Sequence, residues 1–553
     1  MPWTQGYDPL GSLPLSALLA AAPLAVLFGL MAWGRFPGWV PALSALAASL
    51  ALAVGAWEMP PIPAVSAALG GAAYALLPIL WIVFSALWVH SLCVESGQFE
   101  VLKTTLSSIS DDKRLQVLFI AFAFGAFLEG AAGFGTPVAI TAAMLVGLGF
   151  DARSAAVLCL IANSSPVAFA AAGVPVAAAA GVSGLDVATL GRIVGSQVSI
   201  LSLIVPLWLS VVLSGWRRSV EVLPAIAVSR LLLSATQFFI TRFSGPWTAG
   251  IVSGLVTMAG LWLFLRLWKP RRSWDLPGAR APAPSRTSLP GTEGGGSRKV
   301  PPLAVLRAWG PYLIMSLMVL SWSAPWLKEI LQRLDLLVPW PRLHGAILKS
   351  APLVPAPVPY PAVFSLAFAS GPGTAIFLAG IVSIFFLPGL GPRKAIACLG
   401  RTFMGLRSTI LTVCVVVAIA YVMNYSGMSS TLGLALAGTG ALFPLFSPLL
   451  GWLGVLVTGS DTSSNALFCS LQRTTAERLG LPAGLMVAAN ASGGVAGKMI
   501  SPQSIAVATA SARLGAQEGS LFRSTVGHSI AMALLISAIT LVQAYLLPGT
   551  IPR

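Results

Sequence analysis

The feature that most constrains this chain is a series of apolar runs, each about as long as a bilayer is thick. Leu13–Trp33, Trp39–Trp57 and Ile193–Trp216 are three of them, close to the roughly 20 residues that a helix needs to cross hydrocarbon. Hydrophobic residues make up 56% of the chain and charged residues only 9%, a balance that points away from soluble domains. The sequence therefore predicts an all-α polytopic membrane protein with about 12–14 transmembrane helices.

The charge and the cysteines fit this class. The formal net charge of +16 would suggest nucleic acid in a soluble protein. Here most Lys and Arg residues fall in short segments between apolar runs, as the positive-inside rule describes, so we expect a lipid bilayer and no nucleic acid as partner. The five cysteines lie singly, without metal-ligand spacing. Hydrolase motifs such as H-E-x-x-H and G-x-S-x-G are absent, and we expect neither an enzyme nor a cofactor.

One stretch breaks the apolar pattern most strongly. Gly459–Ser504 carries Asp461, Asn465, Lys498 and Gln503, with glycines and hydroxyls between them. A lipid-facing helix does not tolerate this density, because buried polar groups need partners inside the protein. The stretch is predicted to line a protein-enclosed cavity at membrane depth.

A polar linker divides the chain into two halves. Lys269–Pro302 is rich in Pro, Gly, Ser and Arg and has few apolar residues, which is typical of a disordered segment on the cytoplasmic side. We predict an N-terminal membrane half over residues 1–268, a cytoplasmic linker over 269–305 and a C-terminal membrane half over 306–553.

Each half contains two interrupted apolar segments. In the first half, Gly and Pro residues interrupt the chain near 125–137 and 162–175, and in the second near 458–466 and 488–503. In each half a carboxylate, Glu129 or Asp461, precedes a break that contains asparagine and hydroxyl groups. Paired interruptions at matching places in two halves indicate a transporter whose site is formed by broken helices.

The breaks supply groups that suit a small anion. A broken helix frees backbone N–H groups, glycine lets a ligand approach, and Ser, Thr and Asn add hydrogen bonds. The alternative is that these residues only cap the broken helices or join helix to helix. Lys498 could neutralise a substrate carboxylate or pair with Asp461. The predicted substrate-binding residues are Asn163, Ser164, Ser165, Thr462, Ser463, Ser464, Asn465, Asn490, Ser492, Gly493, Gly494 and Lys498.

Three residues are candidates for proton coupling. Glu129 has an apolar, glycine-lined setting, where burial disfavours the charged form, so we expect it to carry a proton near neutral pH. A structural carboxylate paired with a buried base is the alternative. Asp461 could be a second carrier of a proton or cation, or the N-cap of a helix that starts at Thr462. His90 could relay protons with Glu95 nearby, or simply end its helix.

Four blocks of sequence closely resemble the L-lactate permease family, which includes glycolate permeases: Ala126–Ile140, Ala420–Leu432, Phe446–Phe468 and Gly497–Ala506. The resemblance implies a proton-coupled importer of small 2-hydroxymonocarboxylates in the bacterial cytoplasmic (inner) membrane. It also implies two inverted repeats, each with a re-entrant hairpin. The basic linker and a Pro-rich stretch near Val354–Pro361 depart from the family pattern.

The sequence thus predicts a symporter that binds a proton, on Glu129, together with an L-lactate-like or glycolate-like carboxylate between the two broken segments. Neutralising the anion lowers the cost of moving the site across the membrane barrier. A sodium-coupled carboxylate symporter and a passive small-anion channel are the alternatives. A third is an intramembrane hydrolase that pairs a serine with His90 or His528. A homo-oligomer is compatible with the sequence.

Overall fold

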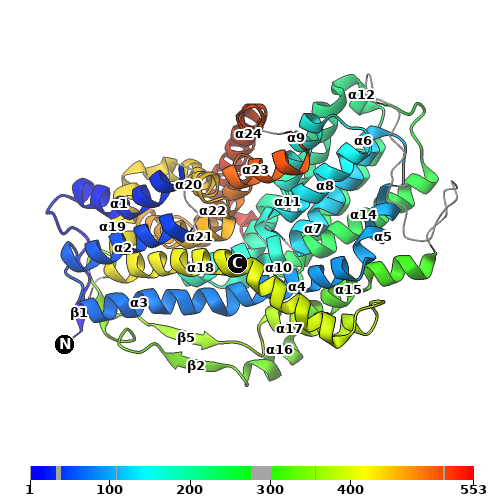
Figure 1. The fold of residues 1–553 in the computed structure, drawn as a ribbon. Coiled ribbons are helices and arrows are strands. Elements are labelled where there is room, and N and C mark those ends of the chain that lie inside the picture. The colour runs from blue at the N-terminus through cyan, green and yellow to red at the C-terminus, as the bar shows by residue number, and fades with distance from the viewer. Residues whose placement is uncertain are drawn as a thin grey trace.

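The structure is a computed structural model, and it describes residues 2–32, 39–107, 109–131, 133, 135–275, 301–322, 324–354, 356–514 and 517–552. Helices dominate it from end to end (Figure 1). Residues 276–300 of the predicted linker lie outside the described residues, and the helix that follows the linker begins at Pro302.

The first half contains fourteen α-helices among its described residues, several of them joined by short π or 3-10 segments. In chain order these elements are α1 (Leu13–Ala32), α2 (Trp39–Gly55), α3 (Pro61–Tyr74), η1 (Ala75–Leu80), α4 (Trp81–Glu95), α5 (Gln98–Ser107), α6 (Lys113–Gln116), η2 (Val117–Phe124), α7 (Gly125–Ala131), α8 (Thr136–Gly147), α9 (Ala152–Asn163), η3 (Val167–Phe169), α10 (Ala170–Ser183), α11 (Val187–Ser214), α12 (Trp216–Val220), α13 (Leu223–Phe243) and α14 (Ala249–Leu267).

The second half follows the linker. Its helical elements are α15 (Pro302–Trp322), α16 (Pro325–Gln332), α17 (Pro372–Ile384), α18 (Pro392–Ser426), α19 (Met428–Leu436), η4 (Ala437–Leu442), α20 (Phe443–Thr458), α21 (Asp461–Leu479), α22 (Ala483–Lys498), α23 (Pro502–Ser511), α24 (Glu518–Tyr545) and η5 (Pro548–Thr550).

Many of these helices are long and apolar enough to cross a membrane. Eight pass this test within the described residues, and the number rises to ten if each bent helix pair counts as one span. Four shorter apolar helices lie among them. The prediction of a polytopic helical membrane protein is confirmed, whereas about 12–14 spans are reached only when the shorter helices are included. Breaks at membrane depth shorten several helices below a full span.

The contacts between helices follow a two-fold pattern. We pair α7 to α11 of the first half with α20 to α24 of the second, in order. Each contact between these two sets of helices then has a counterpart. The contact of α10 with α21 corresponds to that of α23 with α8. The contact of α11 with α22 corresponds to that of α24 with α9. The pattern continues outward, where α1 packs on α19 as α15 packs on α5. Within the described residues, α13 and α14 have no counterpart after α24.

Glycines let several of these helices approach closely. A Cβ on Gly451 would lie 1.9 Å from the carbonyl oxygen of Asn490, and one on Gly497 would lie 2.3 Å from that of Trp452. Gly493 meets the carbonyl oxygen of Pro448 in the same way, at 2.0 Å. The pair α20 and α22 therefore packs backbone to backbone, as small residues allow in membrane helices.

Two small sheets lie outside the helices. β1 (Trp3–Thr4) pairs in parallel with β3 (Ile347–Lys349), which pairs antiparallel with β4 (Val358–Pro359), and the first register aligns Trp3 with Ile347. β2 (Leu336–Pro339) and β5 (Val363–Leu366) form an antiparallel pair. We call β1 to β5 with the segments between β2 and β5 the cap. It packs against α3 and α18, which run side by side (Figure 1).

Candidate functional site

The backbone leaves helical geometry where the sequence is interrupted. Gly133 and Gly135 separate α7 from α8, and Gly459 separates α20 from α21, all with positive φ. Inside α10, Ala171, Ala172 and Gly173 adopt left-handed conformations at φ of 43°, 58° and 78°. A left-handed alanine costs roughly 1–2 kcal/mol, and backbone strain of this kind is found at functional sites.

These breaks surround a small cavity to which both halves contribute. Its volume is about 40 Å³, room for about three waters at ~10–15 Å³ each. A three-carbon hydroxy acid would require the helices to move apart. The lining residues that carry the argument are Glu129, Pro175, Asp461, Thr462, Lys498 and Gln503.

Helix N-termini face this cavity. The helix α21 begins at Asp461, α23 begins at Pro502, and the regular part of α10 begins after Gly173, next to lining residues in each case. The free N–H groups and positive dipole end of a helix N-terminus favour negative charge. The N-cap of α21 is Ser460, whose hydroxyl accepts from the Ser463 N–H at 3.3 Å. The interpretation of Asp461 as the N-cap is therefore wrong.

Two carboxylates are buried at the cavity without enough partners. Asp461 is 4% exposed and Glu129 is 1% exposed. Within the described part of the chain, both carboxylate oxygens of Asp461 and Oε2 of Glu129 have no hydrogen-bond partner. A buried carboxylate without partners is costly unless it takes up a proton or meets a ligand.

Lys498 is the cation that lies near both carboxylates. Its ammonium group donates a hydrogen bond to the carbonyl oxygen of Gly459 and interacts electrostatically with Glu129 and Asp461. Among the described residues, ion pairs within 4.0 Å do not include Lys498. The Lys498–Asp461 pair that the sequence suggested is not formed at contact distance. The Lys498 ammonium group therefore interacts with both carboxylates at longer range and can also attract a bound anion.

Asn465 and Asn490 join helices beside the cavity. The Asn465 amide donates to the Pro175 carbonyl oxygen at 3.1 Å and its Oδ1 accepts from Asn490 at 2.9 Å. Gln472 donates to Asn490 Oδ1 at 3.2 Å. This network satisfies the Pro175 carbonyl at the broken helix, so the structure favours the helix-joining interpretation for both asparagines.

The predicted serines divide between two environments. Ser164 donates to the Ile161 carbonyl oxygen, Ser165 bonds to Ser202, and Ser464 donates to the carbonyl oxygen of Gly451. None of these three lines the cavity. Ser492 is buried with an unpartnered hydroxyl.

Asn163, at the end of α9, is buried, and neither polar atom of its side chain has a hydrogen-bond partner among the described residues. Of the remaining predicted residues, Thr462 lines the cavity, and Ser463 is buried in the first turn of α21. The two predicted glycines allow neighbouring groups to approach the backbone of α22. Gly493 faces α20, and a Cβ on Gly494 would lie 2.1 Å from Asp461 Oδ1.

The histidines lie away from this cavity. His90 Nδ1 is hydrogen-bonded to the Tyr312 hydroxyl at 2.9 Å, and its ring packs edge-on against Phe99. His528 Nδ1 accepts from Trp208 at 3.0 Å. These contacts provide no serine–histidine pair of the kind a hydrolase would need.

Sequence reasoning missed Ser460 and Gln503 as site residues. Both line the cavity, and a Cβ on Gly459 would lie 2.7 Å from Gln503 Oε1. Gln503 was visible as a polar residue at membrane depth directly after Pro502, where α23 begins. That position, the start of a helix after a break, is the signal that would have identified it.

Comparisons with known proteins identify the family of the chain. The L-lactate permease family matches residues 16–547. The chain is 46% identical to the glycolate permease GlcA of Escherichia coli K12 over 99% of both chains, and 42% identical to the L-lactate permease of Bacillus subtilis strain 168 over 100% of both. Among solved structures, the YdaH transporter of Alcanivorax borkumensis is similar with a TM-score of 0.39 at 14% identity, over 86% of each chain. By the family match and these relatives, the chain belongs to the L-lactate permease family, whose members are membrane transporters rather than enzymes.

Proposed function

We propose that this protein carries L-lactate, glycolate and related small 2-hydroxymonocarboxylates across the membrane together with protons. The observation that carries the proposal is the small cavity where Glu129 and Asp461, both buried and short of hydrogen-bond partners, lie near Lys498. The substrate class comes from the relatives named for glycolate and L-lactate.

The charges of the site couple substrate to protons. With both carboxylates ionised, Lys498 leaves the site with one net negative charge, which repels a carboxylate substrate. With both protonated, the positive charge of Lys498 and the negative charge of the substrate cancel. Moving uncompensated charge into a low-dielectric interior is expensive, so substrate binding and proton uptake favour each other. This mutual preference is the thermodynamic requirement for symport.

Within the site each group has a role. The substrate carboxylate would lie at Lys498 and the N-terminus of α21, beside Thr462. The unpartnered amide of Asn163 does not line the cavity in this structure. Once the cavity opens, we expect it to bind the substrate hydroxyl, because an amide can both donate and accept. Opening of the cavity is required for binding, as expected for alternating access around a fixed central site.

The two rival mechanisms fit the site less well. A sodium ion prefers several free oxygen ligands, whereas the Gly459 carbonyl already accepts from Lys498, whose charge repels a cation. A passive channel needs a continuous polar path through the membrane, whereas this cavity holds only about 40 Å³.

We infer the orientation of the protein in the membrane from the charges at its two ends. The loops around Arg114 meet at one end, where its guanidinium donates to the carbonyl oxygens of Arg218 and Arg272. Basic residues gather at this end, among them Lys113, Arg217, Arg218, Arg271 and Arg272. The start of the linker lies there too, because the Trp274 N–H donates to Asp112. By the positive-inside rule this end is the cytoplasmic end. The cap then faces the outside of a bacterial inner membrane.

The test is uptake of labelled L-lactate into proteoliposomes under an imposed pH gradient without sodium. We expect the wild type to concentrate lactate. Glu129→Gln and Asp461→Asn should lose concentrative uptake, whereas Glu329→Gln, at an exposed carboxylate of α16, should behave as wild type. If concentrative uptake by the wild type requires sodium, the assignment of the proton as the coupling ion is wrong. If Glu129→Gln concentrates lactate fully, Glu129 is structural.

A further inference from the structure

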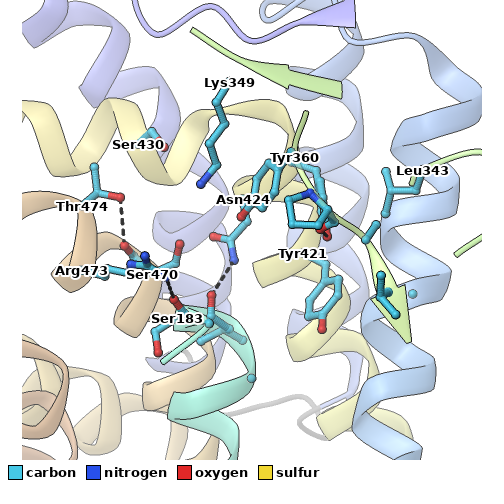
Figure 2. A pocket seen from close by; sticks show the side chains of 18 of the residues that line it. Ser183, Leu343, Lys349, Tyr360, Tyr421, Asn424, Ser430, Ser470, Arg473 and Thr474 are labelled. Atoms are coloured by element: carbon cyan, nitrogen blue, oxygen red, sulfur yellow. Dashed lines mark hydrogen bonds between the residues drawn. The ribbon is translucent and has the colours of Figure 1, made fainter. Parts of the chain in front are cut away.

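A second, larger cavity lies between the cap and the helices below it (Figure 2). Its volume is about 430 Å³, ample for a small carboxylate with several waters. Resting on the transport function proposed above, we propose that this cavity is an outer binding site where Lys349 and Arg473 capture the carboxylate anion before it reaches the central site.

The cavity holds more positive than negative charge. Arg473, on α21, pairs with Glu477 at 2.6 Å and also donates to the Ser183 carbonyl oxygen at 2.6 Å. Lys349 comes from β3 of the cap, and its ammonium lies 4.1 Å from the ring centroid of Tyr360. Among the described residues Lys349 takes part in no ion pair. One carboxylate anion would balance the surplus charge.

The charges around Lys349 favour the binding of an anion. Burial and the neighbouring Arg473 hold the pKa of Lys349 below its usual value, while Glu477 acts in the opposite direction. An anion placed near both cations would relieve their repulsion. A partly buried cation with a like-charged neighbour, facing an open cavity, attracts small anions.

Neutral polar and aromatic side chains complete the lining of the outer cavity. Figure 2 shows Lys349, Asn424 and Arg473 around the same space, with Tyr421 below them. Asn424 donates to the carbonyl oxygen of Val182 at 3.4 Å, and Tyr425 donates to that of Pro361 at 3.0 Å. These bonds hold α18 against both the cap and α10.

Two helices, α10 and α21, run from the outer cavity to the central one. Asp461 and Arg473 are both on α21, separated by ~18 Å along the axis at 1.5 Å per residue. On α10, Pro175 lines the central cavity and Ser183 lines the outer one. Because α10 and α21 pack together, the contact between them is the path along which an anion would pass from the outer cavity to the central one.

The test compares Lys349→Met, Lys349→Arg and wild type by initial rates of lactate uptake. Methionine keeps the stem that packs on Tyr360 but removes the charge. We expect the KM of Lys349→Met to rise about tenfold, the lower end of the range for electrostatic focusing in a charged cleft, with kcat unchanged. Lys349→Arg should restore the wild-type KM. The control is Lys328→Met, at an exposed position of α16.

Salt and pH give a second readout that a purely structural role would not move. Below KM, wild-type uptake should fall with rising ionic strength more steeply than that of Lys349→Met, because screening weakens attraction of the anion. As outside pH rises, wild-type Lys349 loses its charge before Lys349→Arg does, so the arginine variant should keep a low KM at alkaline pH.

The outcomes separate the two proposals. Failure of the wild type to take up lactate would refute the transport function itself. Normal uptake by the wild type, together with an unchanged KM and salt dependence in Lys349→Met, would refute the outer site alone. A fall in kcat without a change in KM would also refute it, because Lys349 would then support the fold rather than the capture of substrate.

Discussion

Gly494 and Asp461 face each other across the contact between α22 and α21. A Cβ on Gly494 would lie 2.1 Å from Asp461 Oδ1 and 2.8 Å from Val455. We therefore predict that Gly494→Ala displaces the Asp461 carboxylate and lowers lactate uptake at least tenfold, since a shift of about 1 Å in a site costs ~10²-fold in rate. Initial uptake rates in proteoliposomes measure this directly.

The control for this substitution is Gly527→Ala. Gly527 is an exposed glycine of α24, and a Cβ there would meet nothing within 4 Å. Alanine should raise helix stability there by roughly 1 kcal/mol without changing uptake. Equal uptake by Gly494→Ala and wild type would show that the position of Asp461 is not critical.

Lys498 differs from the two carboxylates in its expected role. If it binds the substrate carboxylate, Lys498→Met should abolish lactate exchange as well as concentrative uptake. Glu129→Gln should keep exchange, because a neutral side chain still accommodates the anion. Counterflow into lactate-loaded proteoliposomes separates these results, with Lys328→Met as the control. Retained exchange in Lys498→Met would move the anion site elsewhere.

Residue types predicted part of the lining of this cavity and could not predict the rest. Glu129, Asp461, Thr462 and Lys498 do line one cavity, because charged groups at membrane depth have few other places to lie. Serines are different, since a hydroxyl can satisfy itself on a backbone carbonyl of its own or a neighbouring helix. Ser164 does so, and sequence spacing alone does not reveal which way it points.

At the scale of elements, the bend between α9 and α10 is the most distorted part of the site. The two apolar helices meet at 63°. Gly173 has φ of 78°, and a Cβ there would lie 2.7 Å from the Pro246 carbonyl oxygen. We predict that Gly173→Ala destabilises the protein by about 2 kcal/mol or more, from left-handed strain and overpacking together.

Thermal unfolding in detergent, followed by the amount of monodisperse protein that remains, measures this prediction. The matched control is Gly147→Ala in α8, where an added Cβ meets nothing within 4 Å. An unchanged unfolding temperature for Gly173→Ala would mean that the bend relaxes at no cost.

The four interruptions in the sequence coincide with different backbone features. The helix α20 ends at Gly459, and the backbone leaves helical geometry within 162–175. In contrast, α22 continues without a break from Ala483 to Lys498, through Gly493 and Gly494. Gly493 allows close packing against α20, and Gly494 leaves space for the Asp461 side chain. Glycine alone does not distinguish a break from a close contact, whereas Pro502 directly after Ser501 does mark one.

For the whole molecule, the helix contacts repeat across the two halves although the residues do not. Gly133 and Gly135 form the first break in one half, and Gly459 forms it in the other. A repeat of this kind needs breaks and close contacts at matching places, which different residues can supply. The cap was beyond sequence reasoning for another reason: its strands are two to four residues long, and Trp3 pairs with Ile347 far along the chain.

The charge difference between the two ends predicts which end faces the cytoplasm. Two single cysteines test it: His344→Cys in the cap and Arg217→Cys in α12, both at exposed positions. The native cysteines are buried except for Cys414, which is partly exposed, so the unmodified protein sets the background. In intact cells, a membrane-impermeant maleimide should label His344→Cys and leave Arg217→Cys unlabelled. After the cells are opened, Arg217→Cys should label too. The reverse pattern would place the cap and its Lys349–Arg473 cavity in the cytoplasm, where the cavity would meet lactate leaving the central site rather than lactate approaching it.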